Sequence, residues 1–417
     1  MIEKETNMKK ELTAFPIHLI REQFPSLKRT YHGKTVAYLD GPGGSQVVKS
    51  SIEAITRYME NGGANLHGSF PSSRETEDII SQAKSAVGDL LGVKAREVAF
   101  GANMTTLAFS IARALGKKWG KGDEIVVTEI DHRANVDPWI TMAEDRGLSV
   151  KWIKVDPEKL TLQLEKLDEI INEKTRLVAV GLASNAVGTI NDVKAISQRV
   201  KEVGALLAVD AVHAAPHIAI DRDRLGIDIL LCSAYKFFGP HVGVAAIKEE
   251  LFENLEPFKL APAPSYIPDK LETGTQNHEG IAGIQPAIEF FESLGEGTTR
   301  RERILSGIES IEAYENSLAD TLREELSKLQ NVTLYQADGS VPKTPTIAFR
   351  VEGYAPNEVC KILSEEHSIF VTDGDFYATT LADKLGINSS GGWIRAGLAP
   401  YNTIEEINRF IRAVKLL

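Results

Sequence analysis

The residues most able to do chemistry in this chain are one lysine and one aspartate, each carried by an apolar stretch. Lys236 follows the apolar residues 229–234, and Asp210 lies within the apolar stretch 206–212. Lysine is rarely buried without a reason, and a desolvated amine has a lowered pKa, which favours Schiff-base formation with an aldehyde. An aspartate facing a pyridinium nitrogen is the known companion of a lysine that binds pyridoxal phosphate. The pair therefore indicates a pyridoxal phosphate site.

A turn after the predicted strand 97–100 offers a place for a phosphate. Residues 101–106, Gly-Ala-Asn-Met-Thr-Thr, follow this strand and precede a helical pattern. Backbone amides at a helix start and threonine hydroxyls bind phosphate, and Ser233, three residues before Lys236, adds another hydroxyl. The alternative interpretation is an ordinary strand-to-helix turn with capping threonines.

Three further side chains suit the same kind of site. His132 comes just after the predicted strand 124–128, at the edge where open α/β sheets bind ligands, and its imidazole can stack on a flat ring. Asn185 follows another strand and can bond a ring hydroxyl, while the guanidinium of Arg395 suits a substrate carboxylate. Each has a structural alternative: a loop histidine bonded to a carboxylate, an Asx-turn and a salt bridge, respectively.

Two other patterns are similar to known sites but lack features that those sites require. His213 and His217 are separated like metal ligands on a helix, yet Pro216 lies between them and no third ligand cluster accompanies them, so we predict no metal. Residues 41–44, Gly-Pro-Gly-Gly, lack the spacing of a dinucleotide-binding turn. We expect them to form a tight loop that lines a pocket.

A mostly parallel sheet is needed to position these residues. Short apolar runs alternate with helical patterns, and continuous apolar runs are typical of strands buried on both faces. The predicted strands are 97–100, 124–128, 150–155, 177–183, 206–212, 229–234 and 242–247. Residues 191–203 and 138–146 predict crossover helices, the second with Asp137 as its N-cap and Gly147 as its stop.

The pattern changes after residues 260–268, which are rich in proline. A long helix and then shorter strands and helices predict an α+β C-terminal domain. The predicted helices are 301–329, 356–365 and 403–414, and the predicted strands are 332–335, 346–351 and 393–398.

Composition argues against several classes of partner. The 417 residues carry a formal net charge of -11 without a long basic run, which disfavours nucleic acid and anionic membranes. Residues 1–6 mix charges, and no segment has the apolar length of a membrane span. Cys232 and Cys360 form no CxxC motif, so we expect both to be reduced in a cytoplasmic protein.

Taken together, these segments resemble the class V aminotransferase family of fold type I pyridoxal phosphate enzymes, within it the cysteine desulfurase and selenocysteine lyase group. The resemblance covers nearly the whole chain. It implies an α/β fold with a large, mostly parallel-sheet cofactor-binding domain over residues 30–290 and a small α+β domain made of 1–29 plus 291–417. The segments that carry it are 38–40, 65–67, 101–106, 132–135 with Pro138 and Trp139, Ser184 with Asn185, Asp210, Ser233 with Lys236, Gly239 with Pro240, 272–275 and 395–402.

The resemblance also implies a role for individual residues. Lys236 would hold pyridoxal 5'-phosphate as a Schiff base, Asp210 would keep its ring nitrogen protonated and His132 would stack on its ring; these three are the predicted catalytic residues. The other predicted cofactor contacts are Met104, Thr105, Asn185, His213, Ser233 and Thr275, the last of which would reach the other subunit's site in a homodimer. The predicted substrate contacts are Arg395, Asn185 and His67.

The chain departs from the desulfurase pattern at Tyr377, which occupies the place of the loop cysteine. A phenol cannot form a persulfide, because that reaction requires a thiolate. His213 and Tyr235 also replace the family's glutamine and histidine beside the cofactor.

These departures define the functional hypotheses. The first is an enzyme that acts on an amino acid through an external aldimine and Cα deprotonation, with a C–S lyase-type β-elimination. The alternatives are an aminotransferase, an amino-acid epimerase, and a non-catalytic scaffold that binds the cofactor.

Overall fold

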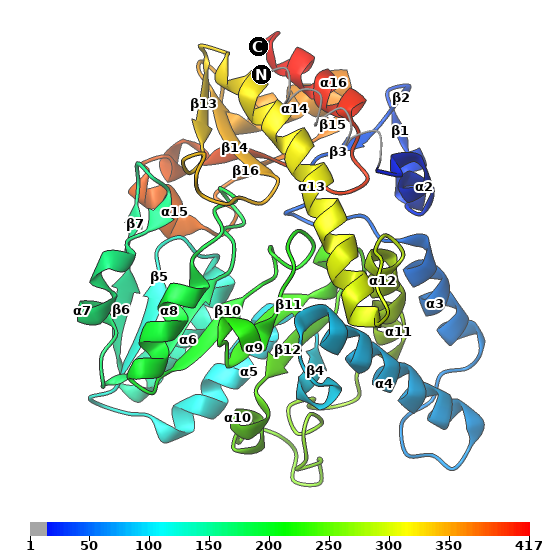
Figure 1. Ribbon diagram of the computed structural model, residues 1–417, viewed down its shortest axis with the longest axis vertical. Coiled ribbons are helices and arrows are strands. Elements are labelled where there is room, and N and C mark those ends of the chain that lie inside the picture. Colours follow the sequence, from blue (N-terminus) through cyan, green and yellow to red (C-terminus); the bar gives the residue numbers. More distant parts are fainter. Residues whose placement is uncertain (1–14) are drawn as a thin grey trace.

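Seven strands form the central sheet of the computed structural model, which describes residues 15–417 (Figure 1). Strand β12 (Gly243–Ile247) runs antiparallel to both of its neighbours, and the other neighbouring pairs are parallel. The predicted mostly parallel sheet is therefore confirmed. In spatial order the strands are β4 (Val98–Gly101), β12 (Gly243–Ile247), β11 (Ile229–Ser233), β10 (Leu206–Asp210), β9 (Thr175–Gly181), β5 (Glu124–Thr128) and β6 (Ser149–Ile153).

Both faces of this sheet are buried, which explains the unbroken apolar runs. Along β10, Leu207 and Val209 belong to one apolar cluster, whereas Ala208, which points the other way, belongs to a second. Helices α5 (Met104–Leu115) and α6 (Asp137–Arg146) contribute to the second cluster, and α8 (Val193–Glu202) contributes to the first. The sheet is thus the middle layer between two sets of helices.

The other helices that follow or flank this sheet lie mostly at its sides and lower end (Figure 1). They are α3 (Lys49–Glu60), α4 (Pro71–Leu91), α7 (Leu167–Ile170), α9 (Arg222–Leu225), α10 (Glu249–Glu253), α11 (His278–Ala282) and α12 (Ile284–Glu292).

The C-terminal residues build a second, antiparallel sheet at the top of Figure 1. Its order is β13 (Val332–Tyr335), β14 (Thr346–Val351), β17 (Trp393–Gly397) and β16 (Thr372–Gly374). The accompanying helices are α13 (Arg300–Ser327), α14 (Pro356–His367), α15 (Thr379–Lys384) and α16 (Ile404–Val414). The long helix α13 runs from this sheet down to the large one (Figure 1).

The described part of the N-terminal region joins the C-terminal elements. Strand β3 (Ala37–Tyr38) pairs in parallel with β15 (Ile369–Phe370), and Asp40 bridges to Gly397. The proposed domain borders at residues 30 and 290 stay a prediction. The remaining small elements are α2 (Ile17–Glu22) and the hairpins β1–β2 (Thr30–Tyr31, Lys34–Thr35) and β7–β8 (Val155–Asp156, Thr161–Leu162).

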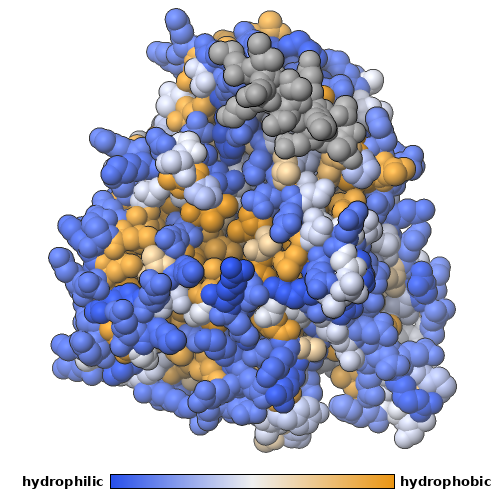
Figure 2. Space-filling view, in the orientation of Figure 1, coloured by the Kyte–Doolittle hydropathy of each residue, from blue (hydrophilic) through white to orange (hydrophobic). Residues whose placement is uncertain are grey.

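Two sequence interpretations fall outside residues 15–417: the charged N-terminal stretch 1–6 and the part of the predicted small domain within 1–14. In the part of the chain that the structure describes, no helix has both the length and the apolar character needed to cross a bilayer. The cytoplasmic location stays a prediction. On the face drawn in Figure 2, hydrophilic residues cover the periphery, and apolar residues gather in the middle of the molecule.

The predicted start of helix α6 is wrong by one position. Asp137 is the first helical residue rather than the N-cap, which is Val136 and makes no side-chain cap. The carboxylate of Asp137 instead forms an ion pair with Arg133 one turn earlier, and this pair competes with capping. The predicted stop is confirmed, because Gly147 ends the helix in the left-handed conformation.

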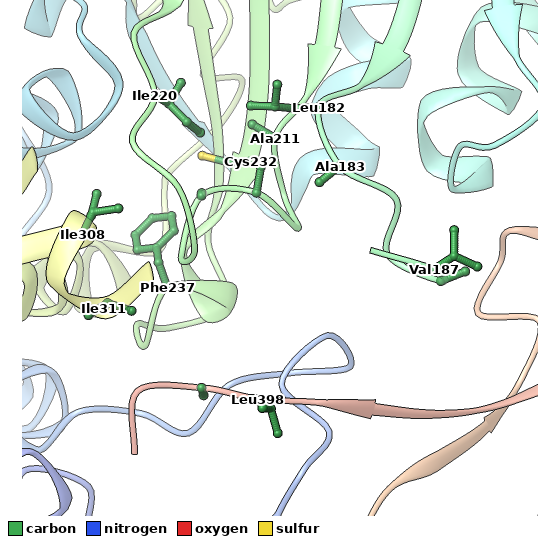
Figure 3. Packing of buried hydrophobic residues seen from close by; sticks show 14 of the residues in the cluster. Leu182, Ala183, Val187, Ala211, Ile220, Cys232, Phe237, Ile308, Ile311 and Leu398 are labelled. Carbon is green, nitrogen blue, oxygen red and sulfur yellow. The ribbon is translucent and has the colours of Figure 1, made fainter. Parts of the chain in front are cut away.

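Helix α13 packs so closely on α12 that a glycine is required at the contact. A Cβ on Gly307 would collide with the carbonyl oxygen of Phe291. Further along α13, Ile308 and Ile311 lie near Phe237, which follows the Lys236 turn (Figure 3). The position of α13 is therefore tied to the elements that carry Lys236.

We expect Gly307→Ala to lower the melting temperature of the protein. Overpacking against a backbone carbonyl costs about 1–3 kcal/mol, which exceeds the ~1 kcal/mol that alanine gains over glycine in a helix. Gly339→Ala is the matched control, because a Cβ there meets nothing within 4 Å. Differential scanning calorimetry of both variants makes the test, and an unchanged or raised melting temperature for Gly307→Ala would contradict the close contact.

Candidate active site

The predicted site residues gather where the strands of the large sheet end. Asp210 pairs with Gly181 and Leu231 across the ends of β10, β9 and β11. A cavity of about 300 Å³ opens at this edge. Of the predicted site residues, those that line it are Lys236, Asp210, His132, Met104, Thr105, Asn185, His213, Ser233 and Arg395.

Lys236 is held in the cavity by a short 3-10 turn, residues Ala234–Lys236, that begins directly after β11. Its side chain is only 8% exposed, and Nζ donates to the carbonyl oxygens of Pro42 and Gly43, the latter at 3.1 Å. Burial, reinforced by the nearby Arg395, lowers the pKa of Lys236 to about 7. A large fraction of the amine is therefore neutral and nucleophilic near neutral pH. The loop 41–44 lines the cavity, as predicted.

Two carboxyl groups stand near this lysine. Asp210 accepts a hydrogen bond from the Val212 N–H (2.8 Å), and burial raises its pKa to about 6. Asp131 accepts bonds from the Gly181 N–H (2.7 Å) and Asn135 Nδ2 (3.0 Å), and burial raises its pKa to about 7, with repulsion from Asp210 adding to the effect. Neither carboxylate has an ion-pair partner among residues 15–417, so a positively charged group in the cavity would be stabilised.

His132 offers a neutral imidazole ring to the cavity. Burial, followed by the positive charges of Lys236 and Arg395, lowers its pKa to about 4. The ring nitrogen Nδ1 accepts a hydrogen bond from the Ala134 N–H at 3.0 Å, which fixes the orientation of the ring. The uncharged, oriented ring can stack on a flat ligand.

The turn before helix α5 has the features of a phosphate site. Asn103 caps the helix by accepting from the Thr106 N–H at 2.8 Å. The Met104 N–H donates to the Ser233 hydroxyl at 3.1 Å, and Thr105 lines the same part of the cavity. The backbone amides at the start of α5 thus lie close to the hydroxyl groups of Thr105 and Ser233. The start of a helix favours a bound anion such as phosphate.

Arg395 lies in the wall that the C-terminal sheet contributes. Its guanidinium donates to the Asn185 carbonyl oxygen (3.0 Å) and to Asp40 (3.3 Å), and it lies 3.8 Å from the centre of the Phe376 ring. The Nε atom of Arg395 and the Oδ1 atom of Asn185 are buried and have no hydrogen-bond partner in residues 15–417. Both atoms are available to a bound molecule.

The two histidines with metal-like spacing have other partners. Nε2 of His213 bonds the hydroxyls of Thr344 and Thr346, and Nδ1 of His217 bonds Glu315. One ring nitrogen of each histidine is therefore bonded to a protein side chain, and the absence of a metal stays a prediction. Within residues 15–417, no group of three or more ligating side chains has the geometry of a metal site.

His67 and Thr275 lie outside this cavity. Both line a second hollow of about 390 Å³, together with Leu260. His67 is exposed, and its nearest acidic partner is Glu77, 3.3 Å away. A single chain therefore does not bring these two predicted contacts to Lys236.

Tyr377 stands at the edge of the Lys236 cavity in a loop with left-handed backbone angles at Phe376 and Tyr377. The Tyr377 carbonyl accepts from the Arg133 N–H (2.8 Å), and the Phe376 carbonyl accepts from Asn185 Nδ2 (2.9 Å). The Tyr377 ring is 68% exposed and lies 5.2 Å from the His132 ring. These contacts fix the loop over the cavity despite its strained backbone.

The two cysteines of the chain lie outside the cavity wall. Cys232 is fully buried in β11, packed beside Ala211 and Ile220 (Figure 3), and burial raises the pKa of its thiol well above the ordinary range. Cys360 is buried in α14, where burial and Asp373 raise the pKa of its thiol in the same way. Neither thiol is ionised near neutral pH, so neither is activated as a nucleophile.

Sequence reasoning did not select three contributions to the site. The first is Asp131, an acidic residue directly before His132. Its position next to a predicted site residue is the signal in the sequence that could have identified it. The pairing of Asp40 with Arg395 joins residues 355 positions apart and leaves no local pattern. Lys236 is bonded by the backbone carbonyl groups of Pro42 and Gly43. Every residue has such a group, so the residue types in the sequence do not identify these two contacts.

The cavity fits pyridoxal 5'-phosphate by its donor set. It combines a desolvated lysine for an aldehyde, an unpaired carboxylate for a pyridinium, a flat imidazole for the ring, and amides with hydroxyls for a phosphate. The unpartnered Asn185 Oδ1 adds a polar atom that the protein itself leaves unsatisfied. Fold and site thus define a fold type I pyridoxal phosphate enzyme.

Comparison with known proteins places the chain within that class. The model of the aminotransferase class-V family matches residues 37–410, and the chain belongs to this family. The aminotransferase-like protein FGM3 of Gibberella zeae is 33% identical over 418 residues, covering 97% of this chain and 99% of that protein. A cysteine desulfurase of Enterobacter sp. (strain 638) is 29% identical over 421 residues, covering 96% and 98%.

A solved structure is also similar to this chain over almost its whole length. The apo structure of the cysteine desulfurase from Thermococcus onnurineus NA1 superposes with a TM-score of 0.86 at 29% identity, covering 97% of this chain and 99% of that one. The family depends on pyridoxal phosphate, so the cofactor and the cysteine desulfurase-like enzyme class follow for this chain.

Proposed function

We propose that this chain is a C–S lyase that catalyses β-elimination from a sulfur-containing amino acid and forms no persulfide. The observation that carries the proposal is the composition of the cavity wall. It holds Lys236 with a pKa of about 7, and among the described residues that line it there is no thiol. A base for a Cα proton is therefore present, and Tyr377 stands where a sulfur nucleophile would be needed for desulfuration.

Pyridoxal phosphate, when bound, supplies an aldehyde for the substrate amine and a ring that accepts the electron pair from Cα. The residues that would hold it are Lys236, Asp210, His132 and the turn around Met104. Asp210 would pair with the protonated ring nitrogen, and the neutral His132 would cover the ring without adding a charge. Arg395, whose Nε is unpartnered, would bind the substrate carboxylate once it exchanges Asp40 for that ligand.

The proposed reaction balances without an external oxidant or a thiol acceptor. The neutral Lys236 amine takes the Cα proton, and the Cβ–S bond breaks with its electron pair remaining on sulfur. The thiolate then takes up a proton. Overall, one cysteine S-conjugate and one water give a thiol, pyruvate and ammonia.

We expect purified holoenzyme incubated with cysteine and cysteine S-conjugates to release thiol and pyruvate in equal amounts. Lys236→Ala should lower this rate by about 10³-fold or more, because both the cofactor linkage and the base are lost. Coupled assays for pyruvate and for free thiol measure the stoichiometry. A matched control is Lys270→Ala, which removes a lysine that also has a lowered pKa but lies outside the cavity.

Other products would contradict the elimination. Formation of a new amino acid that depends on an added keto acid would identify an aminotransferase. Racemised substrate, followed by chiral chromatography, would identify an epimerase. A visible spectrum that does not respond to any amino acid would support a scaffold without catalysis.

We also propose that the protein is a homodimer in which the second hollow faces the other subunit's cavity. Thr275 and His67 line this hollow, and Thr275 would then supply a phosphate contact across the interface. Leu260 lines this hollow and is 69% exposed, and Phe258 and Tyr266, which are close to Leu260 in the sequence, are 57% and 56% exposed. Such a cluster is typical of an interaction surface.

Analytical ultracentrifugation tests the dimer. We expect the wild type to sediment as a dimer and Leu260→Glu to shift it towards monomer, because a buried charge at an interface lacks a partner. Leu416→Glu is the control, since Leu416 is 77% exposed and far along the chain from the hollow. A monomeric wild type at micromolar concentration would refute this arrangement.

A further inference from the structure

The Lys236 cavity opens to solvent at a mouth that carries one aromatic ring. Lys236 and Arg395, which are 8% and 3% exposed, lie inside it. Of the described residues that line the cavity, the exposed ones are Gly43, Asn103, Thr105 and Tyr377, and these four define the mouth. Tyr377 is 68% exposed and presents the only large apolar surface among the four. The mouth therefore offers an aromatic face to a molecule that enters the cavity.

The backbone that carries this ring is fixed from both halves of the molecule. The Tyr377 N–H donates to Asp375 Oδ1 at 3.0 Å, and the Tyr377 carbonyl oxygen accepts from the Arg133 N–H at 2.8 Å. The carbonyl oxygen of Phe376 accepts from Asn185 Nδ2 at 2.9 Å. These bonds keep the left-handed φ angle of 56° at Tyr377. The position of the ring is thus set, while its surface stays open to solvent.

The distance between Tyr377 and its neighbouring ring shows the kind of contact that this position allows. The centre of the Tyr377 ring lies 5.2 Å from that of His132, and the two planes are inclined by 39°. Aromatic rings attract each other when their centres are about 4.5–7 Å apart in offset or edge-on arrangements. A flat group at the mouth can make the same kind of contact with the exposed surface of Tyr377.

The groups that would hold the substrate leave one direction for its side chain. In the proposed reaction Lys236 takes the Cα proton, Arg395 binds the carboxylate, and the amine joins the cofactor. Both residues are almost fully buried. The remaining substituent of Cα is the arm that consists of Cβ, sulfur and the sulfur substituent R. This arm must therefore extend towards the exposed mouth.

Among the four residues of the mouth, Tyr377 is the one suited to bind that arm. Gly43 has no side chain, the Asn103 side chain caps helix α5, and Thr105 lies at the predicted phosphate site. We propose that the Tyr377 ring binds the sulfur substituent R, and that the enzyme selects conjugates in which R is a flat aromatic ring. This substrate class rests on the proposed C–S lyase function, whereas the aromatic subsite itself is testable without C–S cleavage.

Two pairs of ligands isolate the contribution of a flat ring. The first pair is homophenylalanine and 2-amino-4-cyclohexylbutanoate, in which a methylene replaces sulfur, so that no C–S bond can break. The second pair is S-phenylcysteine and S-cyclohexylcysteine, which the proposed lyase would cleave. Within each pair the two rings have a similar size, and only one of them is flat and aromatic.

Three variants at position 377 separate the ring from the hydroxyl group and the backbone. Tyr377→Phe keeps the aromatic face and removes the hydroxyl. Tyr377→Leu and Tyr377→Asn both remove the face, and asparagine tolerates the left-handed backbone better than most residues. Melting temperatures report whether each variant folds, and one folded variant without the ring is enough for the test.

We expect Tyr377→Leu and Tyr377→Asn to raise the dissociation constant of homophenylalanine about 3- to 10-fold, because the contact between the rings is lost. The constant of the cyclohexyl compound should change by less than about 2-fold in Tyr377→Leu, whose side chain still offers an apolar contact. Tyr377→Phe should bind both compounds as the wild type does. Isothermal titration calorimetry of the holoenzyme measures these constants, and their ratio cancels any effect common to both ligands.

The second pair gives an independent readout through thiol release. We expect kcat/KM for S-phenylcysteine to fall about 3- to 10-fold in the two variants without the ring, and that for S-cyclohexylcysteine to stay within about 2-fold in Tyr377→Leu. Each substrate is compared with itself across the variants, because thiophenol and cyclohexanethiol differ as leaving groups.

The outcomes distinguish the subsite from the reaction. Equal changes for homophenylalanine and its cyclohexyl counterpart, or no change for either, would overturn the subsite; equal losses would make the ring only a support for His132. A Tyr377→Phe variant that behaves like Tyr377→Leu would also overturn it, because the hydroxyl would then be the group that binds. A selective loss for homophenylalanine without thiol from any conjugate would reject the proposed function alone. Thiol release without a selective loss would reject the subsite alone.

Discussion

Removing the Lys236 amine from water is the constraint on which the rest of the site depends. An ammonium group in a closed cavity loses hydration energy, and the structure offers it two backbone carbonyl oxygens rather than a direct carboxylate partner. The nearby Arg395 adds repulsion, so the neutral amine is favoured. The same burial keeps Asp131 and Asp210 without a counter-charge, which prepares the cavity for a cationic ring. One physical cause therefore produces both a nucleophile and its electrostatic complement.

The two sheets achieve this desolvation jointly. The large sheet brings Asp210, His132 and the Lys236 turn to one edge, and the C-terminal sheet closes that edge with Arg395. The N-terminal loop 41–44 completes the wall, anchored where Asp40 bridges to Gly397. Helix α13, whose glycine contact fixes it on α12, connects both halves. A cavity built from such distant segments requires the whole fold, which explains why the similarity to known relatives extends over almost the entire chain.

Much of this architecture is predictable from the sequence because buried parallel strands have a simple signature. The run 124–128 coincides with strand β5, and β10 covers residues 206–210 of the predicted run 206–212, so Asp210 lies at the end of the strand rather than within it. What local patterns do not contain are contacts between distant segments. Thr344 and Thr346 look like ordinary strand residues until β14 is placed against His213. The error at Asp137 has another cause: its preference for the N-cap and its pairing with Arg133 are both local signals, and the sequence alone does not show which of them prevails.

The pH dependence of cofactor addition to the apoprotein tests the central claim most directly. Only the neutral amine attacks the aldehyde, so a pKa lowered from 10.5 to about 7 predicts that the rate rises with pH and levels off above about pH 8. Borohydride reduction and peptide mapping should then find the cofactor on Lys236. A rate that still rises steeply towards pH 10, or a reduced cofactor on another lysine, would contradict the account.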